Sequence, residues 1–213
     1  MSEHYFSPHK GTDPSDLGKL REVGVHYRGQ NLSLVAGDKV FSASEVDLGT
    51  EQLLKKAPPL PNEGTFLDLG CGWGPVALTM AAESPAATVW AVDVNERALA
   101  LTRLNAKRAD LDNLRILEAR VALKDARDCA TRFDVIWSNP PIRIGKKALQ
   151  ELLLEWLDLL AESGAAYLVV NRHLGADSLA AWLRDRGFSV SRLASRKGFR
   201  VLEVRGAGSS RLS

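Results

Sequence analysis

The sequence predicts an α/β fold built on a mostly parallel sheet of seven strands, with helices on both faces. From about residue 65 onward, short apolar runs alternate with longer segments of helical periodicity, which is typical of a parallel sheet. One apolar run ends in a glycine-rich turn that leads directly into a helical pattern. The last two runs are separated only by residues 195–198, which are too few for a crossover helix. One edge strand is therefore expected to be antiparallel.

Seven strands and four long helices account for most of the chain beyond residue 60. The expected strands are 65–69, 88–92, 114–118, 133–138, 165–171, 188–194 and 199–204. The expected helices are 74–84, 95–108, 145–162 and 175–186. Leucines recur at helical spacing in segment 145–162, and this stripe is interpreted as core packing rather than as a surface for a partner.

The length and composition fit one globular domain with an extension. At 213 residues, the chain lies at the upper range of a single α/β domain, and 45% hydrophobic residues suffice for a full core. Residues 61–213 are expected to form the core domain, and residues 1–60 an N-terminal extension packed on it. Within the extension, residues 1–25 combine Gly, Pro and charge and are expected to form a loosely ordered arm.

The rest of the extension predicts a hairpin and a short helix. Residues 32–36 and 39–41 alternate in polarity, and Gly37-Asp38 between them is a turn signal. The helix is expected over Thr50–Lys56, because Pro58-Pro59 stop helical structure soon after it.

Several features favour a cytoplasmic protein without a metal. The chain has no apolar run long enough to span a membrane, and it begins without a charged-then-apolar signal segment. Cys71 and Cys129 lack the spacing of a metal site and are expected to be reduced thiols. The four histidines form no evident ligand set. Nothing in the sequence indicates an oligomeric state.

The glycine-rich turn after the first core strand is one candidate binding element. Gly70, Gly72 and Gly74 follow Asp68, and glycines are used where a backbone takes unusual angles or a ligand approaches closely. The helix that begins after the turn offers free N–H groups. Asp93 ends the next strand, where a carboxylate can accept hydrogen bonds from a ribose diol.

The tetrapeptide after the strand at 133–138 is the second candidate element. It consists of Asn139, Pro140, Pro141 and Ile142. Each proline disfavours helical angles at the residue before it, so the carbonyls of Asn139 and Pro140 can point outward as acceptors. A cluster of fixed acceptors beside the Asn139 amide oxygen suits a planar amino group with two N–H bonds.

These motifs together resemble a known enzyme family. Residues 67–74 resemble the first motif of class I S-adenosylmethionine-dependent methyltransferases, and Asp93 matches their acidic ribose ligand. Residues 139–142 resemble the Asn-Pro-Pro-aromatic signature of members that methylate exocyclic or amide nitrogens. The sequence is most similar to the small-domain (RsmC-like) ribosomal RNA guanine-N2 methyltransferases. Their further matching segments are 4–7, 40–42, 46–50, 139–146 and 198–202.

The resemblance implies a Rossmann-like fold, S-adenosyl-L-methionine as the cofactor and RNA as the partner. The implied cofactor-binding residues are Asp68, Gly70, Gly72, Gly74, Asp93, Val94 and Thr50. The implied catalytic residues are Asn139, Pro140, Pro141 and Ile142. By resemblance, the Asn139 side-chain oxygen and the Pro140 carbonyl accept the two amine hydrogens while the nitrogen attacks the methyl group.

Two positions depart from the family pattern. Ile142 stands where many relatives have an aromatic ring, so Tyr5, Phe6 and Phe199 are alternative candidates for stacking on the base. Arg120 stands where relatives often have an acidic residue for the adenine amine, and arginine cannot accept that hydrogen bond.

The uneven charge agrees with an RNA partner. Residues 171–213 contain nine basic and three acidic residues, although the net charge of the chain is only +2. Such basic surfaces attract phosphate backbones. The leading hypothesis is a methyltransferase for a guanine N2 amine, most simply in 16S ribosomal RNA. Two alternatives stay open: a methyltransferase for adenine N6 or a protein glutamine amide, and a non-catalytic RNA-binding module with a decayed cofactor site.

Overall fold

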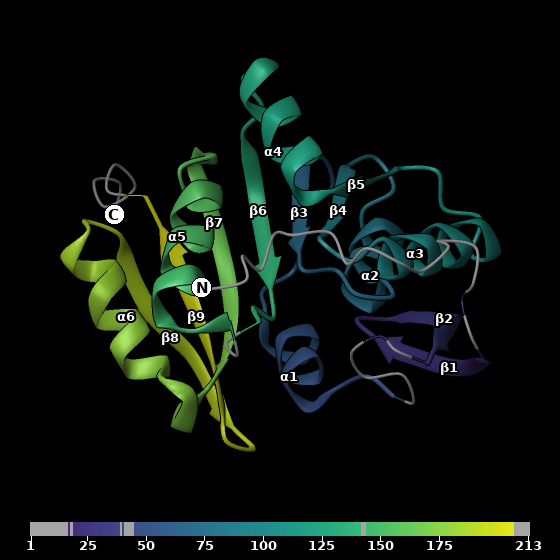
Figure 1. Cartoon of the computed structure of the whole chain (residues 1–213), viewed down its shortest axis with the longest axis horizontal. Coiled ribbons are helices and arrows are strands. Elements are labelled where there is room, and N and C mark those ends of the chain that lie inside the picture. Colours follow the sequence, from purple (N-terminus) through teal and green to yellow (C-terminus); the bar gives the residue numbers. More distant parts are fainter. Residues whose placement is uncertain (1–16, 18, 39, 41–44, 142–143, 207–213) are drawn as a thin grey trace, which may run out of the picture.

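The fold is built on one central sheet. The computed structural model describes residues 17, 19–38, 40, 45–141 and 144–206. Its seven-stranded sheet has the order β5-β4-β3-β6-β7-β9-β8 (Figure 1). The strands are β3 Thr65–Leu69, β4 Thr88–Asp93, β5 Leu114–Glu118, β6 Phe133–Ser138, β7 Leu160–Asn171, β8 Ser189–Arg196 and β9 Phe199–Arg205. Neighbours from β5 to β7 pair in parallel, whereas β9 runs antiparallel to both β7 and the edge strand β8. The predicted fold class is confirmed, and the reversed strand lies next to the edge.

Helices cover both faces of this sheet. They are α1 Leu48–Lys56, α2 Pro75–Glu83, α3 Glu96–Arg108, α4 Ala119–Asp128, α5 Lys146–Leu157 and α6 Ala176–Asp185. Buried residues of α4, α5 and α6 share one apolar cluster, and those of α1, α2 and α3 share another on the opposite face. In the described part of the chain, no helix is long and apolar enough to cross a membrane.

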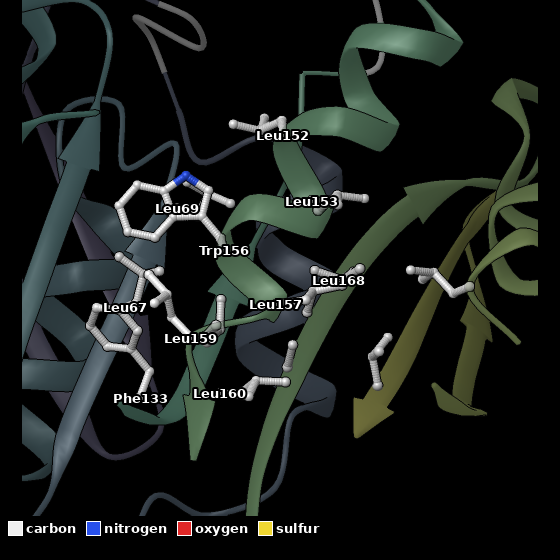
Figure 2. Packing of buried hydrophobic residues seen from close by; sticks show 14 of the residues in the cluster. Leu67, Leu69, Phe133, Leu152, Leu153, Trp156, Leu157, Leu159, Leu160 and Leu168 are labelled. Atoms are coloured by element: carbon white, nitrogen blue, oxygen red, sulfur yellow. The ribbon is translucent and has the colours of Figure 1, made fainter. Parts of the chain in front are cut away.

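The core beneath α5 shows why the leucine stripe of this helix is buried. Figure 2 shows Leu152, Leu153, Trp156 and Leu157 of α5 directed toward Leu67 and Leu69 of β3 and Leu168 of β7. Phe133 stacks edge-on against Trp90, with ring centroids 5.4 Å apart. The interpretation of this stripe as core packing is confirmed. Because parallel strands are covered on both faces, their residues are almost uniformly apolar.

The N-terminal hairpin differs from the prediction. It pairs β1 Leu20–Tyr27 with β2 Gln30–Gly37, and the turn is Arg28-Gly29 rather than Gly37-Asp38. Both turn residues have positive φ, 57° and 76°, as a two-residue hairpin turn of the primed type requires. Residues 20–25, which were expected to belong to the loosely ordered arm, are therefore part of strand β1. Residues 39 and 41 of the predicted second strand lie outside the described residues.

Two side chains attach the hairpin to the core. The Asn105 amide, fully buried in α3, accepts from Val35 N at 2.7 Å and donates to Val35 O at 2.8 Å and to Trp73 O at 2.9 Å. Arg28 donates to Ala57 O at 2.9 Å and pairs with Glu83 through Nη2 and Oε1 at 2.8 Å. The hairpin thus lies beside α2, α3 and the glycine turn (Figure 1). The division of the chain into two units at residue 60 stays a prediction.

The helices differ from the prediction in two places. Helix α4 was not predicted; its buried residues are Ala119, Ala122 and Ala126. Segment 145–162 is helical only to Leu157, and β7 begins at Leu160. The strand starts there because Phe133 N donates to Leu159 O at 2.8 Å, which brings the chain back alongside β6.

Candidate functional site

Polar side chains from three neighbouring strands, β4, β3 and β6, meet where the carboxyl ends of these strands lie side by side. In the parallel register, Leu69 of β3 pairs with Val92 of β4 on one side and with Ser138 of β6 on the other. Asp93 and Asn139 each come one residue after those partners, and the glycine turn begins directly after Leu69. The carboxyl ends of parallel strands are where open α/β sheets bind ligands. Two motifs that lie about 70 positions apart in the sequence are thereby brought together.

The glycine turn leaves open space above this edge. Gly70 and Cys71 both donate their backbone N–H groups to Val92 O, at 2.8 and 3.0 Å. Gly70 and Gly72 have φ of 81° and 57°, and a Cβ at either position would meet nothing within 4 Å. Gly74 differs, because a Cβ there would lie 2.4 Å from Leu78 Cδ1. Gly70 and Gly72 therefore border a cleft, whereas Gly74 packs against its own helix.

Asp68 is a buried carboxyl group behind the turn. Its side chain is only 2% exposed, and its Oδ2 accepts from Ala77 N in the first turn of α2 at 2.9 Å. The pKa of Asp68 is raised to about 8, chiefly by burial, with a smaller contribution from the nearby Asp93 and against the opposing effect of the Ala77 N–H group. A cation that enters the cleft would favour the ionised form of this carboxyl.

The Asp93 side chain connects the end of β4 to the glycine turn through hydrogen bonds. Its Oδ2 accepts from Gly72 N and its Oδ1 from Asn95 N, both at 2.9 Å. Burial raises the pKa of Asp93, and its backbone hydrogen bonds limit that rise. Val94, the next residue, is half-buried and packs against the apolar cluster beneath α4. Asn95 caps α3 through hydrogen bonds from Arg97 N and Ala98 N.

Asn139 presents its amide to the cleft in one orientation. Its Nδ2 donates to both carboxylate oxygens of Asp47 and to Thr50 Oγ1, each at 3.1 Å. Its Oδ1 makes no hydrogen bond within the described part of the chain. The Pro140 carbonyl likewise accepts none from the described residues, whereas the Pro141 carbonyl accepts from Ile144 N at 3.1 Å.

The cleft brings together part of the predicted site, from both candidate elements. Its walls combine the glycine turn, the start of α2, the start of α1 and the end of β6; the lining residues are Val46, Asp47, Thr50, Asp68, Gly70, Cys71, Gly72, Trp73, Pro75, Val76 and Asn139. Asp93 adjoins it through Gly72. Gly74, Val94, Pro140 and Pro141 do not line it, and Ile142 lies outside the described residues. In the described ranges, no group of three His, Cys, Asp or Glu side chains is placed to hold a metal ion.

Asp47 is a charged residue of the cleft that was not among the predicted site residues. It precedes α1 as the N-cap, and its Oδ1 accepts from Gly49 N at 2.9 Å and from Thr50 N at 3.3 Å. An aspartate directly before a helical segment is a capping signal that the sequence does carry. Asp47 and Asn139 are 92 positions apart in the sequence, and no local sequence pattern predicts their contact.

The acidic group at the end of β5 is Glu118. It pairs in register with Asp93 and caps α4, accepting from Arg120 N at 2.9 Å and from Val121 N at 3.1 Å. Arg120 is exposed in the first turn of that helix. A carboxylate therefore lies two positions before Arg120, at the same edge of the sheet as the other site residues.

Comparison with known proteins identifies the family. Residues 31–203 match the methyltransferase small domain family. The chain belongs to this family. Its members are S-adenosylmethionine-dependent methyltransferases, so the cofactor prediction is confirmed together with the predicted family. The cleft fits such a cofactor, since Gly70 and Gly72 leave open space beside it and the buried carboxyl of Asp68, which can pair with a cation, lines the same cleft.

Individual relatives agree with the family. The chain is 32% identical over 205 residues to the uncharacterized protein YbxB of Bacillus subtilis, covering 96% of this chain and 99% of that protein. It is 33% identical over 203 residues to ribosomal RNA small subunit methyltransferase C of Pasteurella multocida, covering 92% of this chain and 58% of that protein. Against the corresponding Aeromonas hydrophila protein, it spans 41% of the relative's length.

Solved structures agree with the fold. T. thermophilus 16S rRNA N2 G1207 methyltransferase (RsmC), in complex with AdoMet and guanosine, superposes with a TM-score of 0.73 at 23% identity. The match covers 88% of this chain and 50% of that chain. A methyltransferase from Pyrococcus furiosus superposes with a TM-score of 0.63 at 22% identity, covering 82% and 89%. At these identities, the likeness establishes the fold.

Proposed function

We propose that this protein transfers a methyl group from S-adenosylmethionine to the exocyclic N2 amine of a guanine in RNA, with 16S ribosomal RNA as the substrate. The single observation that carries the proposal is the orientation of Asn139, whose amide NH2 is engaged by Asp47 and Thr50 and whose oxygen is unpaired within the described residues. Relatives named ribosomal RNA small subunit methyltransferase C support the choice of substrate. A cytoplasmic location is expected for such an enzyme.

The amine of guanine needs two acceptors close together. Its lone pair is delocalised into the ring, so it becomes nucleophilic only when the amine is held with that pair facing the methyl donor. The Asn139 side-chain oxygen and the Pro140 carbonyl are proposed to accept its two hydrogens. Fixed dipoles of this kind lower the barrier through positioning and electrostatic preorganisation.

The chemical step requires no strong base within the site. When bound, S-adenosylmethionine supplies a methyl group activated by its sulfonium charge. The guanine nitrogen forms a bond to the methyl carbon as the carbon–sulfur bond breaks, and the electron pair of that bond stays on sulfur. The methylated nitrogen then loses one proton to water. Asn139 and Pro140 hold the amine in line throughout, and neither needs to change its protonation state.

The remaining residues of the cleft are proposed to hold the cofactor. Gly70 and Gly72 border open space without a Cβ in the way, which supports close approach of a ligand to the backbone. Asp68 would face the ammonium group, directly or through water, and Asp93 would accept from the ribose hydroxyls. Thr50 is assigned to the support of Asn139, because its hydroxyl accepts from Nδ2 at 3.1 Å.

A cationic surface next to the cleft supports RNA as the substrate. Arg172 and His173 are exposed in the short 3-10 helix that follows β7, and Arg172 N donates to Gly198 O at 2.8 Å. This bond places the 3-10 helix against the turn between β8 and β9, and the exposed Arg196 is the last residue of β8 before that turn. Arg172 and Arg196 have no acidic partner within the described ranges. Arginines without an acidic partner beside a site suit a phosphate backbone.

Phe199 connects that surface to the proposed acceptors. A Cβ on Gly49 would lie 3.1 Å from a ring carbon of Phe199 and 3.2 Å from Asn139 Nδ2, so both side chains approach the same backbone position. Phe199 is half-buried at the start of β9. An aromatic ring at this position supports stacking on a base, a role for which the aliphatic Ile142 is poorly suited.

Labelled methyl transfer to ribosomal RNA tests the proposal. RNA from a strain that lacks this protein is incubated with the purified protein and labelled S-adenosylmethionine, then digested to nucleosides for mass spectrometry. The expected product is N2-methylguanosine. N6-methyladenosine would instead indicate an adenine substrate, and label found only in protein would indicate a glutamine amide. Either result would overturn the guanine assignment.

Asn139→Ala is the variant that tests the role of the acceptor. Removing one preorganised dipole typically costs on the order of 100-fold in rate. We expect at least that loss in transfer, with the affinity for S-adenosylmethionine nearly unchanged. Transfer at the wild-type rate would remove Asn139 from the proposed catalytic role.

A further inference from the structure

We infer that Asp47 is a positioning residue that sets which end of the Asn139 amide faces the substrate. Asn139 follows β6 and Asp47 precedes α1, yet both Asp47 oxygens lie 3.1 Å from Asn139 Nδ2. An amide carries its oxygen and its nitrogen on opposite sides of Cγ. Holding the nitrogen toward α1 therefore directs the oxygen away from α1, into the cleft that both residues line.

The chemistry of the partners determines this orientation. An ionised carboxylate only accepts hydrogen bonds, so Asp47 attracts the NH2 end of the amide and repels the oxygen end. The Thr50 hydroxyl donates its hydrogen to Asp47 Oδ2, which leaves its lone pairs free to accept from Asn139. Both acceptors therefore favour the same end of Asn139. The reversed orientation would direct two donors into the cleft, where they would oppose the donors of an incoming amine.

The Asp47 carboxylate is itself rigidly held. Besides Asn139, it accepts from Gly49 N, Thr50 N and Thr50 Oγ1. Gly49 is buried between the carboxylate and the ring of Phe199, so the first turn of α1 cannot shift without disturbing both. Four hydrogen-bonded groups thus converge on one half-buried carboxylate. Such a supporting shell is what keeps a reacting group within the tolerance that catalysis requires.

This inference predicts a specific defect in Asp47→Asn. The new amide can still cap α1 through its oxygen, but it then presents NH2 toward Asn139. Two NH2 groups repel each other, so Asn139 reverses and its oxygen leaves the cleft. The expected loss in kcat is on the order of 100-fold, comparable to the loss of one preorganised acceptor. KM for RNA and the affinity for S-adenosylmethionine should change less than about threefold. A change of roughly this size is no larger than the deviation in free energy seen between sites that are not coupled.

The matched control is Asp134→Asn. Asp134 is also half-buried, and its Oδ2 accepts from Thr65 N at 2.9 Å, at the opposite end of β3. The substitution has the same chemistry and affects a carboxylate–backbone contact of similar length. We expect unchanged kcat in this variant. An equal loss of kcat in both variants would show that the Asp47 effect is general destabilisation.

A second measurement does not depend on activity. In protein with ¹⁵N-labelled asparagine, the Asn139 side-chain NH2 signal is assigned through its absence in Asn139→Ala. In the wild-type protein, both amide protons should exchange slowly with water and resonate downfield, as protons bound to a carboxylate do. Asp47→Asn should shift them upfield and speed their exchange. Unchanged NH2 signals in Asp47→Asn would overturn the inference.

Should that variant not fold, Asp47→Ser keeps an oxygen for the cap, removes the acceptor for Asn139, and is expected to give the same changes.

The kinetic part of this inference rests on the proposed function, whereas the amide orientation does not. If the wild-type protein fails to methylate guanine, the proposed function fails, and the NH2 signals still decide whether Asp47 orients Asn139. If the wild-type protein methylates guanine and Asp47→Asn retains full kcat, the proposed function stands and the positioning role is wrong.

Discussion

The Asp68 carboxyl accepts a hydrogen bond from the backbone N–H of Ala77 at 2.9 Å, which joins the end of β3 to the first turn of α2. This contact supplies one donor to a group that is otherwise surrounded by protein, and burial still raises the pKa of Asp68 to about 8. The carboxyl is therefore mostly protonated in the free protein near pH 7. A ligand that carries an ammonium group would favour the charged form.

We predict that the affinity for S-adenosylmethionine rises with pH between about 5.5 and 7. Below the pKa of about 8, the free protein must release the Asp68 proton when the cofactor ammonium binds, so protons compete with the ligand. The affinity should increase by up to about tenfold per pH unit, the limit for release of one proton. Calorimetry in buffers of different ionisation enthalpy measures both the affinity and the protons released.

Asp68→Asn should flatten this dependence, because the amide has no proton to release. Asp38→Asn is the control, since Asp38 is an exposed partner of Arg21 on the surface of the hairpin. The control should keep the slope of the wild-type protein. A slope that persists in Asp68→Asn would assign the titration to another group.

A second prediction separates two glycines of the turn. In Gly74→Ala, the new Cβ would lie 2.4 Å from Leu78 Cδ1 at a φ of 96°, so backbone strain and overpacking act together. We expect a loss of about 2–4 kcal/mol in the free energy of unfolding, measured by urea denaturation without cofactor.

Gly72→Ala is the matched variant. Its φ is 57° and a Cβ would meet nothing within 4 Å, so the free energy of unfolding should fall by only about 1 kcal/mol. The same Cβ would project into the space proposed for the cofactor, and the affinity for S-adenosylmethionine should fall at least about tenfold, or 1.4 kcal/mol. Unchanged affinity would mean that the cofactor does not pass over Gly72.

The sequence predicted the sheet well because each strand and long helix carries its own apolar pattern. Helix α4 was missed although Ala119, Ala122 and Ala126 recur at helical spacing, because its buried face consists of small residues and it begins directly after Glu118, the last residue of β5, without a turn signal between them. The hairpin turn was misplaced because Arg28, at a φ of 57°, occupies a position where glycine or asparagine is the usual marker. Both errors therefore concern segments whose residue types do not mark the start of an element or a turn.

Strand order accounts for the part of the candidate site around the glycine turn better than for the part around Asn139. Asp68, Gly70, Gly72 and Asp93 lie within two short segments, and strand order alone brings those segments together. The contact of Asp47 with Asn139 depends instead on how α1 packs over the end of the sheet. No periodicity encodes that packing, so this part of the site required the three-dimensional structure.

A third prediction concerns the attachment of the hairpin. The Arg28 side chain is 10% exposed, lies 5.0 Å from the Trp137 ring centroid and pairs with Glu83, which is 17% exposed. Arg28→Gln would leave the Glu83 carboxylate without its charged partner in a mostly buried site. Breaking such a pair typically costs about 3 kcal/mol in the free energy of unfolding. Thermal and urea denaturation should both report this loss.

The control for this variant is Arg21→Gln, at the other end of β1. Arg21 is 52% exposed and lies 3.9 Å from Asp38, so its removal should change stability by less than about 0.5 kcal/mol. Equal effects of the two substitutions would contradict a specific role for the Arg28–Glu83 pair.

The last prediction tests the surface beside the cleft. Arg172 lies in the 3-10 helix after β7 and Arg196 is the last residue of β8, and the bond from Arg172 N to Gly198 O joins these two regions. Both arginines are exposed, and neither has an acidic partner among the described residues. If each contacts one phosphate, the double substitution to glutamine should reduce the slope of log affinity against log salt by about 1.4, at about 0.7 per phosphate of a single strand. Fluorescence anisotropy with a ribosomal RNA fragment over a range of salt concentrations measures that slope.

Arg132→Gln is the control, because Arg132 is an exposed arginine just before β6, at the opposite end of the strands from the cleft. The control should keep the wild-type slope, and both proteins should bind S-adenosylmethionine normally. An unchanged slope in the double variant would place the RNA on another face of the molecule.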